Sequence, residues 1–474
     1  MLKLMRNLLA EKQILQDESG NQIKWDYLVK LERLQATEGL RAGNKLTERH
    51  ISWTKQKMKV NLAAQTLSSS VADALEFCRD DLGMHEFQDC AATVRYIRIL
   101  DRVFDLLNSR NPLAKGYKAP LRCSNEVFWR PFVSEAKSYL WELRMANGDR
   151  VCETNRKTGV IGLIACLTSY CDLFDKLVAA SAAPLKYLLG YKFSQDHIEL
   201  FFGAIRGRGG WNNNPTARQF KAAYKRLLVH QNVKAVVTGN CLPQEPIELL
   251  SISSKIEREQ QFTSSEIDSR LSSVTMESCP PPNDHDYSDV PDLTHLSMFV
   301  ENVVGYVAGF VVRKVKDKVC CDTCESVLTE ADNDSQVVSN SKSQSDADRL
   351  LQRKNRGGLF KPSDDVVSVC KLSERAFRTF FNAHGNKPPS GTKIRHSLVN
   401  QVLSMLTTSD LFFSLNEHDM EQDVLNSHRV RLVKLICDQY FAVRFYHAGK
   451  VFTRALQGDR IRSVLTKTVI FKGQ

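Results

Sequence analysis

The stretch Lys192–Trp211 reads KFSQDHIELFFGAIRGRGGW and brings acidic, aromatic and basic side chains close together. Asp196 and Glu199 are three residues apart, so a helix would place both carboxylates on one face. Two carboxylates on one face can bind a divalent cation through hard oxygen ligands. Arg206 and Arg208 follow among glycines, which allow close backbone approach, and their guanidinium groups can contact phosphate. The alternative is a capped helix whose acidic first turn is simply solvated.

A helix over residues 194–206 would position these side chains. Ser194 is a good N-cap, and Asp196 falls in the first turn, where the helix dipole favours an anion. Phe201 and Phe202 would then bury the opposite side of the helix. The glycine-rich GRGGWNNNP cannot stay helical, and a strongly basic helix, PTARQFKAAYKRLLVH, is predicted to follow it.

The preceding part of the chain has the apolar periodicity of helices. Residues 1–35 are predicted to be helical on both sides of a turn at Asp17–Asn21. Residues 36–112 are predicted to hold further helices, which Gly83 and Asn111–Pro112 bring to an end. After charged turns, VIGLIACLTSYCDLFDKLVAA is predicted to form a buried helix.

Composition changes twice in the second half. Residues 245–295 are polar and rich in serine and proline, which indicates a linker. Residues 296–322 recover an apolar pattern, and residues 327–357 are again of low complexity and are predicted to be disordered. The remainder of the chain, to Gln474, has helical patterning.

The overall composition is that of a globular, intracellular protein. The chain has 474 residues, of which 42% are hydrophobic and 25% charged, and no apolar run reaches the length of a membrane span. The amphipathic N-terminus does not resemble a signal peptide. The net charge of +11 favours polyanionic partners, above all nucleic acid. The thirteen cysteines are scattered, as in a reduced cytosolic or nuclear protein.

Cys321 and Cys324 form a C-x-x-C pair, which is half of a tetrahedral zinc site. Cys370, His384 and His396 are candidate partners, but they do not stand at the spacing of a recognisable second pair. Ordinary reduced cysteines are therefore the favoured interpretation, with a structural zinc as the alternative. The dispersed histidines His418, His428 and His447 are interpreted as structural.

A longer string that starts at Lys192, KFSQDHIELFFGAIRGRGGWNNNPTARQFKAAYKRLLV, resembles the C-terminal catalytic segment of P-element-type DNA transposases, including their THAP-domain relatives. The resemblance extends upstream through GNKLTERHI, KMKVNLAAQTLS and FDLLNSRNP, and downstream through YVAGFVVRKV. It implies a mostly α fold: a helical GTP-binding insertion domain, the C-terminal part of an RNase H-like α/β domain, and a helical C-terminal region. The implied divisions are 1–20 (RNase H-like helix), 20–140 (GTP-binding insertion), 150–235 (RNase H-like C-terminal part), 245–295 (linker) and 296–474 (C-terminal region).

The same resemblance implies functional residues. Glu199 matches the last catalytic acid of a two-metal DNA-cleaving centre, and Asp196 matches the ligand of the nucleotide's Mg²⁺. The implied GTP-binding residues are Lys45, Lys59, Val60, Phe104, Asp105, Asn108 and Asp196. The other two catalytic acids and any THAP zinc finger are expected upstream of residue 1. The implied enzyme is a DDE-type transposase that is catalytically incomplete as given; the alternative is a noncatalytic remnant that binds GTP together with DNA or protein.

The chemistry of these residue types is compatible with the implied roles. A carboxylate at Asp105 can accept hydrogen bonds from guanine N1–H and N2–H₂, which adenine does not offer. Phe104 could stack on the base, and Lys45 and Lys59 could neutralise phosphates. Taken without the resemblance, these residues are solvated lysines and a helix end with one core aromatic. The segment GLRAGNKLT does not have P-loop spacing, so GTP would be bound in another way.

The expected partner is DNA at transposon ends, in the nucleus, with no membrane association and with a homo-oligomer as the working form. The candidate DNA contacts are the basic residues Arg206, Arg208, Lys221, Lys225 and Arg226.

Overall fold

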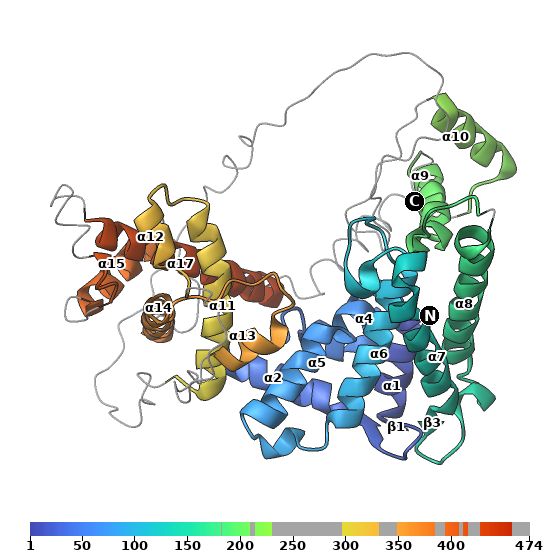
Figure 1. Cartoon of the computed structure of the whole chain (residues 1–474), viewed down its shortest axis with the longest axis horizontal. Helices are drawn as coiled ribbons and strands as arrows, with labels where there is room; N and C mark the ends of the chain where they lie inside the picture. Colours follow the sequence, from blue (N-terminus) through green and yellow to red (C-terminus); the bar gives the residue numbers. More distant parts are fainter. Residues whose placement is uncertain are drawn as a thin grey trace, which may run out of the picture.

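The computed structural model describes residues 1–181, 183–208, 214–229, 296–330, 348–383, 394–406, 411–415 and 427–456 of the chain, the last segment with side chains to residue 448. Within these residues the protein is mostly helical and carries one small three-stranded sheet (Figure 1). The predicted fold class is therefore confirmed. The predicted linker over residues 245–295 lies outside the described residues.

The N-terminal half is built from helices around the long central helix α6. Its helices are α1 (Leu2–Lys12), α2 (Asp26–Glu38), α3 (Glu48–Ile51), α4 (Val60–Thr66), α5 (Ser69–Glu76), α6 (Ala91–Leu107), α7 (Glu126–Glu142), α8 (Thr158–Phe174), α9 (Asp196–Arg208) and α10 (Ala217–Val229).

The sheet replaces part of the helical stretch predicted for residues 1–35. Strand β1 (Ile14–Gln16) pairs antiparallel with β2 (Gln22–Lys24) on one side and with β3 (Arg144–Met145) on the other. The predicted turn is the hairpin between β1 and β2, in which the Asp17 carboxylate accepts the backbone N–H of Asn21 at 2.8 Å. Strands of two or three residues are too short to give a periodic signal in the sequence.

Two further helix predictions need correction in detail. The apolar segment before Gly83 is not one helix, since α4 ends at Thr66 and α5 starts at Ser69. Ser69 explains the break, because its backbone N–H, at 2.9 Å, and its hydroxyl both donate to the Asp101 carboxylate on α6. Helix α8 buries only one face, and Ile161 on it is 39% exposed, although the whole segment is apolar.

The C-terminal half is a second set of helices packed on α11. Its described helices are α11 (Met298–Lys316), α12 (Asp322–Ser326), α13 (Arg349–Lys354), α14 (Asp364–Ala383), α15 (Ile394–Leu406) and α17 (His428–Leu456). Helices α11, α14 and α17 contact one another, and α13 lies between α11 and α5 (Figure 1). No described helix is both long enough and apolar enough to cross a membrane.

Residues 348–357, which fall in the stretch predicted to be disordered, instead form α13 and the turn after it. Charge pairing with the N-terminal half is the reason. The Arg353 guanidinium donates at 3.1 Å to Asp80, and Arg356 pairs at 3.1 Å with the buried carboxylate of Asp73 on α5. A polar, low-complexity segment is ordered here because acidic partners far away in the sequence fix it.

A second link between the halves is a network around Glu374, which is completely buried. Its carboxylate accepts hydrogen bonds from Arg444 at 2.9 Å and from Arg378 at 2.9 Å. The same two guanidinium groups donate to the carbonyls of Gly39 and Glu38. Those carbonyls end α2, where cations are favoured by the helix dipole and by otherwise unpaired backbone groups. The C-terminal half therefore caps a helix of the N-terminal half.

The third link is the ammonium group of Lys354, which is 9% exposed. It donates to the carbonyl of Ala42, to Asn44 at 2.9 Å and to Ser70 at 3.0 Å, and lies 4.8 Å from the centre of the Tyr306 ring. Burial lowers the pKa of Lys354 to about 8. The folded chain therefore releases this proton at a lower pH than the unfolded chain does.

The titration of Lys354 predicts a pH-dependent contribution to stability. Because the unfolded chain binds more protons between pH 8 and 10, this lysine makes the free energy of unfolding rise with pH there by about 2 kcal/mol. Lys354→Met should lose this rise. The measurement is urea unfolding of wild type and variant at both pH values, taking the difference so that other titrating groups cancel. An identical pH dependence in the two proteins would contradict the assignment.

Candidate functional site

The C-terminal end of α6 holds three of the predicted nucleotide-binding residues. Phe104 and Asp105 lie in the last turn, and Asn108 follows the helix with its backbone N–H bonded at 2.9 Å to the Phe104 carbonyl. All three are partly buried. Phe104 packs against the main hydrophobic core, so part of its ring area is already used in the fold.

Asp105 has an unusual electrostatic environment. Burial, together with the nearby carboxylate of Asp101, raises the pKa of Asp105 to about 6. The opposing charge comes mainly from Lys118, whose ammonium nitrogen is 3.7 Å from the Asp105 carboxylate and is well exposed. A half-buried carboxylate with one long ion pair can still accept further hydrogen bonds.

A close backbone contact places the segment before α9 against the end of α6. Gly190 lies so near that a Cβ atom there would be 2.4 Å from the carbonyl oxygen of Leu107. Its backbone N–H donates to the Ser109 hydroxyl at 2.9 Å, and the N–H of Tyr191 donates to the Ser109 carbonyl at 3.1 Å. Only glycine allows this approach, which fixes the start of α9 beside Asn108.

Arg110 joins the two elements. Its guanidinium group donates to the Asn108 side chain at 3.2 Å and pairs with the Asp196 carboxylate at 3.4 Å. It also lies 4.3 Å from the centre of the Tyr191 ring, which in turn packs edge-on against His197. The structure thus brings Asn108 and Asp196, 88 positions apart in sequence, onto one arginine. Sequence reasoning missed Arg110, although it stands in the quoted string FDLLNSRNP.

Helix α9 carries the two acids in different surroundings. Asp196 is its first residue and is partly buried, whereas Glu199 is exposed one turn further on. The helix starts two residues later than predicted, and Ser194 accepts the N–H of Asp196 only at 3.4 Å. Phe202 was expected to be buried but is 41% exposed. Helix α9 instead uses its residue Ile205 to pack against α10.

The predicted phosphate-binding lysines lie elsewhere on the surface. Lys45 is exposed in the loop before α3, Lys59 is exposed just before α4, and Val60 starts α4 and is partly buried. Within the described part of the chain, neither lysine forms a hydrogen bond or ion pair with Asp105, Asn108 or Asp196.

Lys59 lines a cleft between the two halves, with a volume of about 1840 Å³. The cleft runs from the α2–α4 region to α11 and α17, and the basic and aromatic residues in its lining include Arg41, Arg49, Lys55, Tyr306, Phe310, Arg313 and Lys314. Cationic groups next to exposed aromatic rings are typical of surfaces that bind nucleotides or nucleic acid strands.

The predicted DNA contacts cluster on α9 and α10, which form a helical hairpin around Ile205, Ala223 and Leu227. Arg206 on α9 is exposed, as are Lys221, Lys225 and Arg226 on α10. The side chain of Arg208 lies outside the described residues.

The C-x-x-C pair Cys321–Cys324 lies next to a residue that was not among the candidate partners predicted from the sequence. Cys370 is buried beside Cys437, His396 is exposed, and His384 lies outside the described residues. His428, interpreted above as structural only, instead places its Nδ1 atom 3.3 Å from the Cys324 sulfur. A hydrogen bond from the Cys324 backbone is the main factor that lowers the pKa of the Cys321 thiol.

Comparison with known proteins identifies three family matches along the chain. Residues 1–120 match the TNP-like GTP-binding insertion domain, and residues 191–225 match the TNP-like RNase H C-terminal domain. Residues 295–450 match the C-terminal domain of DNA transposase THAP9. The fold and site therefore define a helical protein of the TNP-like class, with an insertion domain of the GTP-binding type beside an RNase H-type segment.

Individual relatives agree with this class. Human DNA transposase THAP9 is 27% identical over 442 residues, which cover 92% of this chain and 47% of the relative. The Transposable element P transposase of Drosophila melanogaster is 22% identical over 423 residues, covering 87% of this chain and 46% of that protein. The chain therefore spans about half the length of these curated relatives.

Among solved structures, the Drosophila P element transposase strand transfer complex matches with a TM-score of 0.40 and 21% identity, over 49% of this chain and 50% of that one. The three family matches and both relatives confirm the predicted resemblance to P-element-type DNA transposases.

Proposed function

We propose that this chain binds GTP and acts in DNA transposition as the part of a P-element-type transposase that connects the nucleotide to the DNA-handling helix α9. The observation that carries the proposal is the Arg110 bridge between Asn108 at the end of α6 and Asp196 at the start of α9. Family membership supplies the reaction class, since both relatives are transposases by name.

The residues at the end of α6 fit a guanine base. Asp105 offers a carboxylate with one long ion pair, and a carboxylate can accept both N1–H and N2–H₂ of guanine. Asn108 adds an amide beside it, and Phe104 offers the exposed part of its ring. Lys118, Lys45 and Lys59 are exposed cations that could approach phosphates.

Asp196 would hold the Mg²⁺ that accompanies the nucleotide, as its hard carboxylate oxygens suit that ion. In the chain alone the carboxylate is paired with Arg110, which keeps it oriented toward the end of α6. A bound Mg²⁺ would supply charge neutralisation for the phosphates there. The guanidinium of Arg110 would remain as a second positive group at the same place.

Glu199 is proposed as the last acid of a DNA-cleaving centre. Its exposed position one turn beyond Asp196 leaves it accessible to DNA. Two-metal cleavage needs several carboxylates around the ions. Among the described residues, the group of three possible metal ligands is the Cys321, Cys324 and His428 cluster, which does not include Glu199.

The second candidate is a noncatalytic protein that binds GTP and DNA or protein. The two candidates separate in a strand-cleavage assay on DNA with Mg²⁺ or Mn²⁺. Cleavage that Glu199→Ala abolishes while GTP binding persists would identify the catalytic form. Absence of cleavage by a chain that binds both GTP and DNA would identify the noncatalytic form.

The GTP assignment predicts base selectivity and a defined pH dependence. Asp105→Asn should weaken GTP binding by about 100-fold, since the variant keeps the shape but loses an ionised acceptor for two donors. In wild type, affinity should fall as pH drops through about 6, because protonation of Asp105 removes the ionised acceptor. Isothermal calorimetry with GTP and ATP, from about pH 5 to about pH 8 and so on both sides of the transition, measures both effects.

The melting temperature of Asp105→Asn serves as the control for folding. Removing a partly buried charge whose pKa is raised should leave the melting temperature at pH 7.5 unchanged or higher, so lost binding cannot be attributed to unfolding. Equal affinity of the wild-type chain for GTP and ATP would show that the end of α6 does not recognise the guanine base.

The proposed DNA surface is the α9–α10 hairpin, with Arg206, Lys221, Lys225 and Arg226 directed to solvent. A net charge of +11 supports a polyanionic partner. DNA at transposon ends, a nuclear location and a homo-oligomeric working form are proposed with it, on the basis of the transposase relatives.

Salt dependence tests this surface. Replacing Lys221, Lys225 and Arg226 together by alanine should lower the slope of log affinity against log salt by about three, because each lost phosphate contact removes about one released counterion. Fluorescence anisotropy with duplex DNA measures the slope. The matched control replaces the exposed Lys12, Arg156 and Lys157, which removes the same charge at the end of α8 opposite to the one that packs next to α9. Equal slopes in the two triple variants would rule out α10 as the contact surface.

A further inference from the structure

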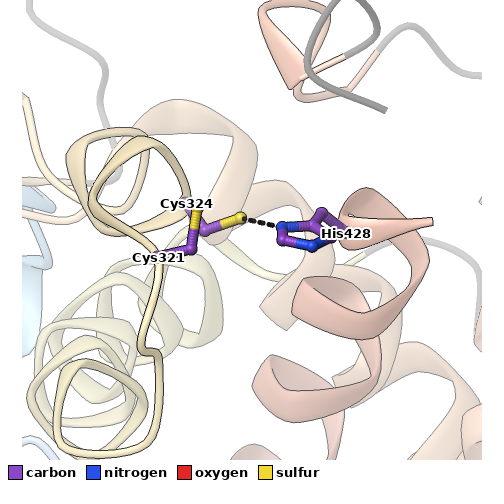
Figure 2. Close-up of side chains that lie close together, drawn as sticks. All are labelled: Cys321, Cys324 and His428. Carbon is purple, nitrogen blue, oxygen red and sulfur yellow. Dashed lines mark hydrogen bonds between the residues drawn. The ribbon is translucent and has the colours of Figure 1, made fainter. Parts of the chain in front are cut away.

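A second cluster of metal-ligating side chains lies in the C-terminal half, apart from the nucleotide site. Cys321 immediately precedes α12, Cys324 lies within it, and His428 starts α17 (Figure 2). The Cys324 sulfur is 3.3 Å from His428 Nδ1, and the three potential ligand atoms all lie within 4.8 Å of one another. Figure 2 shows both sulfur atoms and the imidazole ring grouped between the two elements.

We propose that Cys321, Cys324 and His428 bind a structural Zn²⁺ ion. Two thiolates and an imidazole are ligands that zinc prefers, and a spacing of two residues is the usual one for a cysteine pair. In a tetrahedral site, Zn–S and Zn–N bonds of ordinary length place sulfur about 3.6 Å from nitrogen and the two sulfurs about 3.8 Å apart. The Cys324–His428 separation of 3.3 Å is close to this sulfur–nitrogen value, and the bound of 4.8 Å on the other pairs leaves at most about 1 Å to close.

The surroundings suit a closed site more than a surface one. Cys324 is 4% exposed, while Cys321 and His428 are partly buried. Two thiolates and a divalent ion together carry no net charge, so burial of the loaded site has a small desolvation cost. A hydrogen bond from the Cys324 backbone holds the Cys321 thiol at the start of α12, so both sulfurs lie close to His428. Within the described part of the chain the group has these three members, and a fourth ligand would complete the tetrahedral site.

The inferred ion would have a structural purpose. It would tie the end of α11, through α12, to the start of α17, elements more than 100 positions apart in sequence. Closing so long a loop restricts the unfolded chain, and ligand binding contributes directly to folding free energy. Helix α17 carries Arg444, one of the groups that caps α2, so the metal would also support the contact between the halves.

Metal content of the full chain tests the proposal. Protein purified under reducing conditions without chelator should contain about one zinc per chain by mass spectrometry, as expected for a single structural site. Cys324→Ser and His428→Ala should each lower this content to a small fraction. Cys320→Ser is the matched control, because this adjacent cysteine is exposed and outside the cluster, and it should keep the zinc.

Replacing the His428 imidazole by a thiolate distinguishes zinc coordination by this residue from a role in packing alone. His428→Cys should retain zinc, because a thiolate can replace the imidazole, whereas His428→Ala should not. If the depleted variants fail to fold, the wild-type chain still decides the matter, since Co²⁺ bound there should show the intense visible bands of a tetrahedral thiolate site. Metal-free wild-type protein with reduced thiols, a disulfide between Cys321 and Cys324, or zinc that persists in Cys324→Ser would overturn the proposal.

Discussion

The candidate site depends on one guanidinium group. Arg110 contacts Asn108, Asp196 and the Tyr191 ring at once, and it thereby connects the end of α6 to the start of α9. The close approach at Gly190 makes this possible, because any larger residue would push the α9 segment away from the Leu107 carbonyl. The two hydrogen bonds are long, at 3.2 and 3.4 Å, but the groups are only partly exposed, so water screens this bridge less than it screens a fully exposed ion pair. The acid assigned to the nucleotide's metal and the acid assigned to DNA cleavage consequently share one helix, but they have different surroundings.

The two halves are held together by polar groups that are buried only because each has a partner. Glu374 orients Arg378 and Arg444 toward the last carbonyls of α2, and Lys354 donates to three acceptors from the N-terminal half. Removal of one member would leave a buried charge or acceptor unpaired, which costs far more than loss of an exposed ion pair. This arrangement explains why a basic cleft lies between the halves: its walls are fixed by the same contacts that join them.

Much of the fold could be predicted from the sequence, because long amphipathic segments such as α6 and α14 give a clear helical period. The strands β1 to β3 could not, since two or three residues carry no periodic signal. Helix α13 was also missed, because its order depends on Asp73, Asp80 and Asp81, which lie far away in the chain. For the site, Asp196 and Glu199 stood out by type and spacing, whereas the role of Asp105 was implied only by the family resemblance. The Arg110 bridge and the approach of His428 to Cys324 could not be found, because both join residues that only tertiary packing brings together.

The central claim is that Arg110 couples the nucleotide site at the end of α6 to helix α9. Hydrogen–deuterium exchange with and without GTP and Mg²⁺ tests it most directly. Binding at the end of α6 should slow exchange in residues 104–110 and, through Arg110, also in residues 190–205 of the α9 segment. In Arg110→Ala the first protection should persist while the second is reduced, because the Mg²⁺ at Asp196 is then the only proposed link between the nucleotide and α9. GTP binding that changes hydrogen exchange in neither segment would contradict the account. So would protection of the α9 segment that is equal in wild type and Arg110→Ala.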